Sequence, residues 1–525
     1  MKQDASQTPS SPVNIVADAL QSLKMETVHS QASMVETRHW LNNPGLTDPS
    51  LVDLTHLPFV TIDNPDSRDL DQALLIERHD DRTYRVRYAL ADAAYYVPPG
   101  SALFASALAR GATYYTPILS VPMLPTELSE GLVSLNPQVD RRALVFDMIV
   151  DDQAVVSRTC VERARIHSQA KLDYAGVQAW LDSDPQPQRP YDESLLLLRE
   201  LGNLLIQAAG RRGVVRFDRT ETRISVEGQP PRFTASRRKR YATERYNEQL
   251  SLMCNMQGAE MMLALSGVSD AVQAVFRVHE APLRKSLGEL RDTLAQFAER
   301  QPEPALWRWQ KGQSLADYVD KLPQAARYRG QVLSIQRQIM QAQRASSFTP
   351  DAGEHHALKA ASYARFSSPM REVVGIFTHK ELLEALGGHS YDKDVDTDLR
   401  DAVIESANHS RQVQRKLEKT IEFATLFSVF SNELTLAEPP EHAGTIMGLR
   451  GDRLYVSLED LAMDVKVYRE DIEQQFGTDY EMGDIAATPS NRQCPEWVLG
   501  DAVQLRVRSY DEGRKRFRFT LAGHD

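Results

Sequence analysis

The sequence has few cysteines and no long hydrophobic run. Only three of its 525 residues are cysteines, Cys160, Cys254 and Cys494, and they lie far apart without paired spacing. This distribution argues against a disulfide framework and against a cysteine-ligated zinc site, and it favours a reducing compartment, so we expect a cytoplasmic protein without disulfides. No apolar run reaches about 18 residues, and we therefore expect no membrane span. The N-terminus lacks the basic start and apolar core of a secretory signal.

The sequence also lacks an excess of positive charge, because its 72 acidic residues outnumber its 61 lysines and arginines and give a net charge of −11. Binding to phosphates requires a basic surface, so this sum alone argues against a nucleic-acid partner. However, a channel lined with lysine and arginine can lie inside an acidic shell, and the local distribution of charge decides. Two basic clusters either face such a channel or form a solvated surface: Arg211, Arg212, Arg216 and Arg219, and then Arg237, Arg238, Lys239 and Arg240.

The pattern of hydrophobic residues predicts an α+β protein of several domains. We expect a helix over residues 16–41, a proline-broken linker over 42–58, and a strand hairpin that turns at His79-Asp80-Asp81. Long helical periods follow, over residues 193–207, 244–265, 282–299, 330–344 and 398–430. Strands and helices are segregated more than they alternate, which favours the α+β class.

The last 80 residues or so have a different pattern, typical of a small all-β domain. Two hairpins are predicted, with turns at Gly451-Asp452 and at residues 511–513, and several short strands suggest a five-stranded barrel of the OB type. The final arm interleaves arginines and a lysine with Phe517 and Phe519. This composition is typical of a groove for single-stranded nucleic acid. The alternative is a solvated strand whose phenylalanines lie in the barrel core.

The segment FVTIDNPDSRDLDQAL, residues 59–74, places Asp63, Asp66, Asp69 and Asp71 within nine positions. A plain surface loop can be this acidic. A calcium loop of the EF-hand type does not fit, because its glycine and terminal glutamate are missing. The third interpretation is a magnesium site, in which cations held by carboxylates offset their mutual repulsion and assist phosphoryl transfer.

The same segment resembles the signature of the catalytic (RNB) domain of the ribonuclease II and ribonuclease R family of 3′-to-5′ exoribonucleases. Other segments are similar to the family in the same order: ALADAAYYVPPGS, RGATYYTP, MLPTELSEGLVSLNP, RRALVFDM, SQAKLDY, FRVHEAP and YARFSSPMR. The resemblance covers about residues 59–430, and the tail is similar to an S1-type barrel. It implies three parts: a helical extension and linker over residues 1–58, an RNB domain over 59–438 and an S1-like OB domain over 439–525.

The resemblance also implies roles for single residues. Asp63, Asp69 and Asp71 correspond to the metal-site aspartates, whereas Asp66 lies in the spacer and is expected to be a loop residue. The position of Gln72 usually holds a second adjacent aspartate, so we expect its amide to ligate the metal or orient water without adding charge.

Arginine and aromatic positions complete the implied site. Arg371 corresponds to the arginine on the scissile phosphate and, with Asp71, is expected to be catalytic. The residues expected to contact RNA are Tyr115, Tyr174, Phe217 and Glu418.

Glu372 departs from the family, which favours a basic residue at that position. An acidic group beside a phosphate path is unexpected, and we expect Arg365 to supply replacement charge. The resemblance also leads us to expect a more open RNA entrance, because 58 residues before the motif are too few for the cold-shock barrels that family members commonly carry.

We therefore predict a metal-dependent 3′-to-5′ exoribonuclease that hydrolyses single-stranded RNA to nucleoside 5′-monophosphates by a two-metal mechanism, with Mg²⁺ as cofactor and Mn²⁺ as an alternative. We expect a monomer that does not contact a membrane. Gln72 and Glu372 keep a second hypothesis open: a catalytically impaired RNB-fold protein that binds RNA as a regulator. A third hypothesis is an interaction protein that has lost its RNA path.

Overall fold

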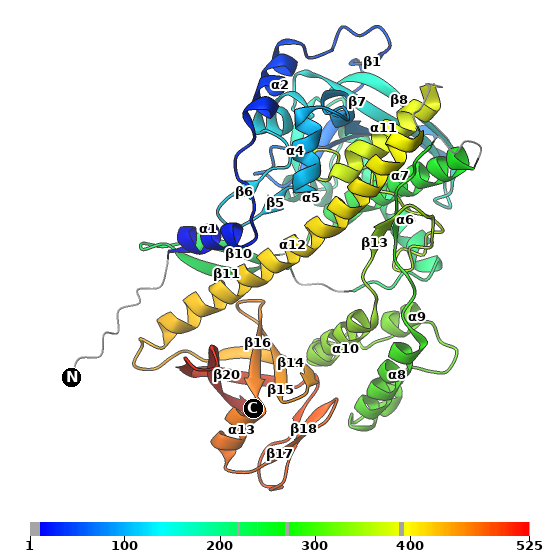
Figure 1. Cartoon of the computed structure of the whole chain (residues 1–525). Coiled ribbons are helices and arrows are strands. Elements are labelled where there is room, and N and C mark those ends of the chain that lie inside the picture. Colours follow the sequence, from blue (N-terminus) through cyan, green and yellow to red (C-terminus); the bar gives the residue numbers. More distant parts are fainter. Residues whose placement is uncertain (1–10, 218–220, 239, 268–271, 388–392, 524–525) are drawn as a thin grey trace, which may run out of the picture.

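A computed structural model describes residues 11–217, 221–238, 240–267, 272–387 and 393–523. A large body of helices around a central sheet lies at one end, and a small barrel lies at the other (Figure 1). The 41-residue helix α12 (Lys393–Glu433) runs from the body to the barrel and connects them. Within the described ranges, no helix combines the length and apolar content that crossing a membrane requires.

The body is built on a seven-stranded mixed sheet in the order β1-β8-β7-β4-β3-β2-β9. The pairs β1–β8 and β2–β9 are parallel, and the others are antiparallel. The predicted hairpin is confirmed as β3–β4. The strand bounds are β1 Val52–Leu54, β2 Val60–Asp63, β3 Gln72–Asp80, β4 Thr83–Ala91, β7 Asp140–Asp151, β8 Val156–His167 and β9 Ala170–Asp173.

Successive side chains of a strand point to opposite faces of the sheet. Helices cover both faces of this sheet, so alternate residues enter two different cores. Leu74 and Ile76 of β3 pack in a core with the helices α5 (Tyr174–Asp182), α6 (Asp192–Arg211) and α7 (Ala242–Ser266). Ala73 and Leu75, the alternate residues, pack in a second core with α3 (Ala93–Tyr96), α4 (Ala102–Arg110) and α11 (Val373–Gly387). The α+β prediction is confirmed.

Shorter elements lie around these layers. Two hairpins are formed by β5 (Tyr114–Tyr115) with β6 (Ser120–Val121) and by β10 (Glu221–Glu227) with β11 (Arg232–Arg238). The strands β12 (Phe276–Val278) and β13 (Ser347–Thr349) pair although they are far apart in sequence. The remaining helices are η1 Glu127–Leu132, α8 Arg284–Glu299, η2 Pro304–Leu306, α9 Leu315–Asp320, η3 Ala326–Tyr328 and α10 Arg329–Ala342.

The N-terminal helix prediction is wrong in one respect, because two helices replace one. The helices α1 (Pro12–Ser22) and α2 (Gln31–Asn42) are separated by a segment in which Lys24 has a positive φ of 54°. Ser30 caps α2 through a hydrogen bond that its Oγ accepts from the Ser33 N–H at 3.1 Å. Such a cap satisfies an N–H group that the helix leaves unpaired, so the chain has a favourable place to restart the helix.

The tail forms the predicted barrel, a five-stranded sheet in the order β16-β15-β14-β20-β21. Its two hairpins, β14–β15 and β20–β21, are those expected from the sequence. The bounds are β14 His442–Arg450, β15 Arg453–Leu458, β16 Asp464–Tyr468, α13 Arg469–Phe476, β17 Tyr480–Met482, β18 Ala486–Pro489, β19 Trp497–Val498, β20 Ala502–Asp511 and β21 Arg516–Gly523.

The final arm follows the alternative interpretation rather than that of an RNA groove. Phe517 and Phe519 are buried in the barrel core, and both rings contact Phe430 of α12. The guanidinium groups of this arm bind a carboxylate of α13: Arg514, Arg516 and Arg518 all form ion pairs with Glu470. Aromatic rings and cations of this arm therefore stabilise the barrel itself.

Candidate active site

The acidic segment forms a loop between β2 and β3, held by hydrogen bonds of its backbone. Asp63 is the last residue of β2, and Asp69 and Asp71 precede β3, which begins at Gln72. The Leu70 N–H donates to Ser134 Oγ at 3.0 Å, and the Leu135 N–H donates to the Leu70 carbonyl at 3.0 Å. These bonds fix the backbone at Leu70, between Asp69 and Asp71. Asp66 is exposed, as expected for a spacer residue.

Asp71 is the buried member of the group, with only 2% of its surface exposed. One carboxylate oxygen accepts a hydrogen bond from the Met370 N–H at 2.9 Å, and the other accepts one from Arg371 Nε at 2.6 Å. Burial raises the pKa of Asp71 to about 6, although the positive charge of Arg371 opposes this shift. The two predicted catalytic residues are thus an ion pair between segments that lie 300 residues apart in sequence.

Arg371 lies at the centre of the negative charges. Burial alone would lower its pKa, but Asp71, Tyr115, Asp69 and Asp63 outweigh burial and raise the pKa well above its ordinary value. About a third of the Arg371 side chain remains exposed, and no described residue forms a hydrogen bond to its Nη1 or Nη2. The outer edge of the guanidinium is therefore available to a ligand.

A small cavity of about 140 Å³ adjoins this pair. Its lining includes Asp63, Asp71, Tyr174, Asn247 and Arg371. Tyr174 is the first residue of α5, and its hydroxyl accepts a hydrogen bond from Asn247 Nδ2 at 3.2 Å. Burial, followed by the charge of Asp63, raises the pKa of the Tyr174 hydroxyl to about 12, so it remains protonated near neutral pH. The structure thus brings Tyr174 to the aspartates.

Gln72 also lines the cavity, but both ends of its amide are engaged. The nitrogen donates a hydrogen bond to the Ser367 carbonyl, and the oxygen accepts one from the Tyr88 hydroxyl. Nothing in the sequence indicates these partners. One is a backbone carbonyl 295 residues away, and the other lies 16 residues away on the next strand.

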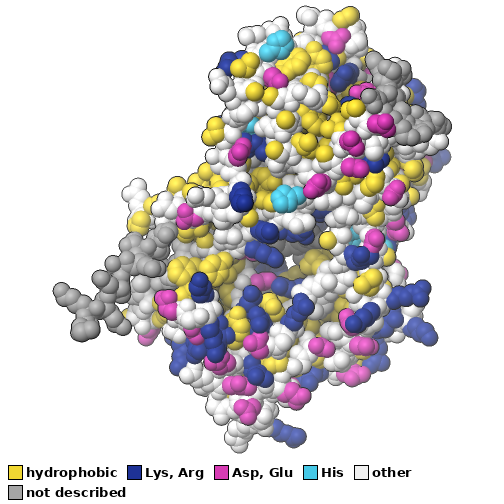
Figure 2. Space-filling view, viewed as in Figure 1, with side chains coloured by type: hydrophobic (Ala, Val, Ile, Leu, Met, Phe, Trp, Pro, Cys, Tyr) yellow, Lys and Arg dark blue, Asp and Glu magenta, His cyan; other side chains and the backbone are white. Residues whose placement is uncertain are grey.

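Tyr115 connects the aspartates to a much larger groove. Its hydroxyl donates to Asp69 Oδ2 at 3.0 Å, while 47% of its surface is exposed. The groove has a volume of about 1280 Å³ and is lined by the β10–β11 hairpin, α10, α12 and the barrel. Lysine and arginine side chains gather around a hollow between body and barrel (Figure 2). The arginines that line the groove are Arg223, Arg237, Arg327, Arg329 and Arg337.

The basic clusters predicted from the sequence contribute unequally to this groove. Arg237 lines it, whereas Arg238 pairs with Glu221 and Glu244 and Arg240 pairs with Glu248. In the other cluster Arg216 pairs with Asp320, and both Lys239 and Arg219 lie outside the described residues.

Two predicted RNA contacts lie away from the aspartates. Phe217 packs at the edge of the apolar cluster that contains Leu290, Trp307 and Ile335. Glu418, on α12, lines the large groove and accepts a hydrogen bond from Gln414 at 2.9 Å. The roles predicted for these two residues stay predictions, and the structure associates only Glu418 with a cavity.

The unexpected acid Glu372 is paired. Arg365 lies 2.8 Å from its carboxylate, and Arg277 is also close. Burial alone would raise the pKa of Glu372, but these arginines outweigh burial and lower it. Arg365 therefore neutralises Glu372. Its own charge is paired, so, contrary to the expectation from the sequence, Arg365 does not offer a free replacement charge to a phosphate.

Asn255 is a site residue that the sequence analysis missed. Its Oδ1 accepts hydrogen bonds from the N–H groups of Phe366, at 2.8 Å, and Ser367, at 3.1 Å. Its Nδ2 donates to Ser367 Oγ at 2.9 Å. A lone asparagine inside a helical period gives no signal of this contact.

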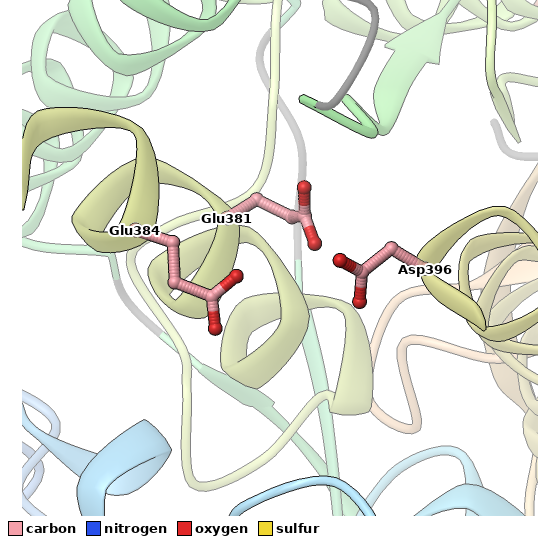
Figure 3. A group of neighbouring side chains, drawn as sticks. All are labelled: Glu381, Glu384 and Asp396. Atoms are coloured by element: carbon pink, nitrogen blue, oxygen red, sulfur yellow. The ribbon is translucent and has the colours of Figure 1, made fainter. Parts of the chain in front are cut away.

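Asp63 and Asp71 line the small cavity, and carboxylate oxygens of this kind suit a hard divalent cation. Another acidic trio is packed more closely: Glu381, Glu384 and Asp396 place ligand oxygens within 4.8 Å of one another. Figure 3 shows Glu381 and Asp396 turning their carboxylates toward each other. Lys380 Nζ lies within 2.8 Å of all three, so this trio already has a cation.

Comparison with known proteins gives consistent results. Residues 51–388 match the family model of the RNB domain. Over 488 residues the sequence is 28% identical to Ribonuclease R of Vibrio parahaemolyticus, an alignment that covers 90% of this chain and 56% of that protein. The chain thus spans little more than half the length of this curated relative.

Solved structures share the fold. Mycoplasma genitalium RNase R, in complex with ribose-methylated single-stranded RNA, is similar with a TM-score of 0.82 and 19% identity, over 98% of this chain and 78% of that one. Yeast Ssd1, described as a pseudonuclease, is similar with a TM-score of 0.67 and 12% identity, over 97% of this chain and 60% of that one.

Proposed function

Because the chain belongs to the RNB domain family, we propose that it is a 3′-to-5′ exoribonuclease that hydrolyses single-stranded RNA to nucleoside 5′-monophosphates. The observation that carries this proposal is the buried Asp71–Arg371 pair, which lies beside a cavity shared with Asp63 and Tyr174. The names of the relatives, which are ribonucleases, support the same substrate and reaction.

The groove and the small cavity suit the two tasks of such an enzyme. A single strand would lie along the arginines of the groove and reach the aspartates past the exposed ring of Tyr115. Stacking of a base on an aromatic ring tolerates any sequence, which an enzyme that removes successive nucleotides requires. Tyr174 and Asn247 would position the terminal nucleotide in the small cavity.

In the reaction we propose, the outer guanidinium edge of Arg371 binds the scissile phosphate and stabilises the charge that develops on it. Asp71 holds this guanidinium through Nε and so fixes its direction. A magnesium or manganese ion held by Asp63, Asp69 and Asp71 would supply Lewis-acid activation of the phosphate and of water.

Digestion of a 5′-labelled single-stranded RNA tests this proposal, with magnesium, with manganese and with chelator. We expect products that shorten from the 3′ end only when metal is present. Asp71→Asn should abolish cleavage, whereas the control Asp66→Asn should retain it, because Asp66 belongs to the same motif but is exposed. Metal-independent cleavage, or equal activity in the Asp71→Asn variant, would contradict the mechanism.

A catalytically impaired RNA-binding protein is the second candidate, and the amide at Gln72 favours it, as does the likeness to a pseudonuclease. It predicts that the labelled RNA stays intact but shifts on a native gel. This result would exclude the enzyme and support the regulator.

A further inference from the structure

The segment that carries Arg371 is fastened to its surroundings at several points. At the start of this segment, Asn255 accepts hydrogen bonds from two backbone N–H groups, those of Phe366 and Ser367. Near the end of the segment, Asp71 accepts a hydrogen bond from the Met370 N–H at 2.9 Å. Between them, the Ser367 carbonyl accepts a hydrogen bond from the Gln72 amide. Gln72 and Asp71 are adjacent in sequence, so the start of β3 holds this segment twice.

The two partners of Gln72 determine how its amide is oriented. A backbone carbonyl can only accept a hydrogen bond, so the amide nitrogen must face Ser367. The oxygen then faces the hydroxyl of Tyr88, a residue of β4 with none of its surface exposed. With the opposite orientation, the two oxygens of Gln72 and Ser367 would face each other. The amide oxygen thus accepts a hydrogen bond from a buried phenol and is held in one direction by it.

We propose that Gln72 is a positioning residue, which with Tyr88 ties the Arg371 segment to β3, and that it is not a ligand of the catalytic cation. The expected effect of Gln72 on RNA turnover rests on the proposed function. The expected effect on the Arg371 segment and on cation binding does not. A carboxylate at position 72 would improve a metal site but would place two acceptors face to face at Ser367. The ligand role and the positioning role therefore predict opposite effects of an acidic substitution.

Four variants separate these roles. Gln72→Met removes the amide but keeps the size of the side chain, and Gln72→Glu adds a charge. Tyr88→Phe removes the hydroxyl that donates to the amide oxygen. Tyr84→Phe is the matched control. Tyr84 lies on the same strand, nearer the turn of the β3–β4 hairpin, and its hydroxyl would lose a similar hydrogen bond, to Glu200 at 2.5 Å.

Three measurements are made on each variant: Mn²⁺ affinity by titration calorimetry, hydrogen exchange of the amides of residues 366–371, and RNA turnover. For Gln72→Met and Gln72→Glu we expect the Mn²⁺ affinity to stay within about twofold of that of the original chain. Hydrogen exchange of the amides of residues 366–371 should become about tenfold faster, because the segment loses one buried hydrogen bond. Turnover should fall about tenfold. Tyr88→Phe should change exchange and turnover in the same direction, and Tyr84→Phe should change neither.

A ligand role would give a different pattern. If Gln72→Glu binds Mn²⁺ at least tenfold more tightly and Gln72→Met correspondingly more weakly, with unchanged exchange in residues 366–371, the proposal is wrong. Unchanged exchange in Tyr88→Phe would equally overturn the Tyr88 part. If the original chain shows no turnover, the proposed function fails, whereas exchange and Mn²⁺ affinity still decide the role of Gln72.

Discussion

His442 joins the barrel to α12 through two carboxylates, and we predict that this junction weakens at alkaline pH. The imidazole lies 2.7 Å from Asp460 through Nδ1 and 3.0 Å from Glu433, near the end of α12, through Nε2. Because carboxylates only accept, both ring nitrogens must carry a proton. The hydrogen bonds to Asp460 and Glu433 outweigh burial and raise the pKa of His442 from 6.5 to about 9.

This shift sets both the size and the sign of the effect. A difference of roughly 2.5 pKa units corresponds to about 3 kcal/mol of stability, at 1.36 kcal/mol per unit. The folded state has the higher pKa, so this contribution is complete below pH 6.5, the pKa of the unfolded state. It declines as the pH rises and is lost above about pH 9.

Urea unfolding at pH 6 and at pH 9.5, followed by circular dichroism, measures this contribution. We expect the difference in unfolding free energy between the original chain and His442→Gln to be about 3 kcal/mol larger at pH 6 than at pH 9.5. His409→Gln, a substitution of an exposed histidine on α12, is the control and should show no such difference. If the His442→Gln difference is equal at both pH values, the reasoning from a charged imidazole is refuted.

Three further predictions concern packing, buried charge and stacking. Gly258→Ala should destabilise the protein by about 1–3 kcal/mol in urea unfolding, because the added Cβ would overlap the ring of Phe366. Lys380→Met should lower the free energy of unfolding by about 3 kcal/mol at pH 8, because it leaves the buried Glu381 carboxylate without its cation. The loss should be smaller at pH 5.5, since burial raises the pKa of Glu381 to about 7 and protonation removes the charge. An equal loss at both pH values in urea unfolding would contradict this. Tyr115→Ala should weaken binding of a single-stranded RNA, measured by fluorescence anisotropy with chelator, about tenfold or more, and Tyr115→Phe should not.

Much of the fold could be predicted because hydrophobic periodicity reflects burial directly. Tyr84, Val86 and Tyr88 of β4 recur at every second position, and the structure buries all three in one core, while the long helices match their apolar stripes. The break between α1 and α2 could not be predicted in the same way. It depends on the positive φ of Lys24 and on the cap at Ser30, and neither interrupts the apolar pattern strongly.

The candidate site was predictable only where a motif carried it. Asp71 and Arg371 belong to motifs in the right order, and the structure joins them through a hydrogen bond. Phe217 lies in a segment without such a motif, and it packs at the edge of the apolar cluster that contains Trp307. The barrel shows the same limit, since arginines that look suited to phosphate are bound by Glu470, whose position on α13 no local pattern indicates.

The cluster of aspartates need not depend on a cation to fold, because its charges have separate partners. Asp71 binds Arg371, and Asp69 accepts the hydroxyl of Tyr115. Lys171 Nζ donates to the loop carbonyls of Pro65, at 2.9 Å, and Ser67, at 2.5 Å, and so adds positive charge beside the loop.

Repulsion between these carboxylates is therefore offset by the protein itself, and the divalent ion of the proposed mechanism is needed for chemistry more than for folding. In the magnesium interpretation of the sequence, bound cations offset the repulsion between the carboxylates of this loop. In the structure, residues from β9, the β5–β6 hairpin and the segment of Arg371 converge on this loop. A chelator should accordingly abolish RNA cleavage while leaving the urea midpoint of unfolding nearly unchanged, and a large fall in that midpoint would show that the ion holds the loop together.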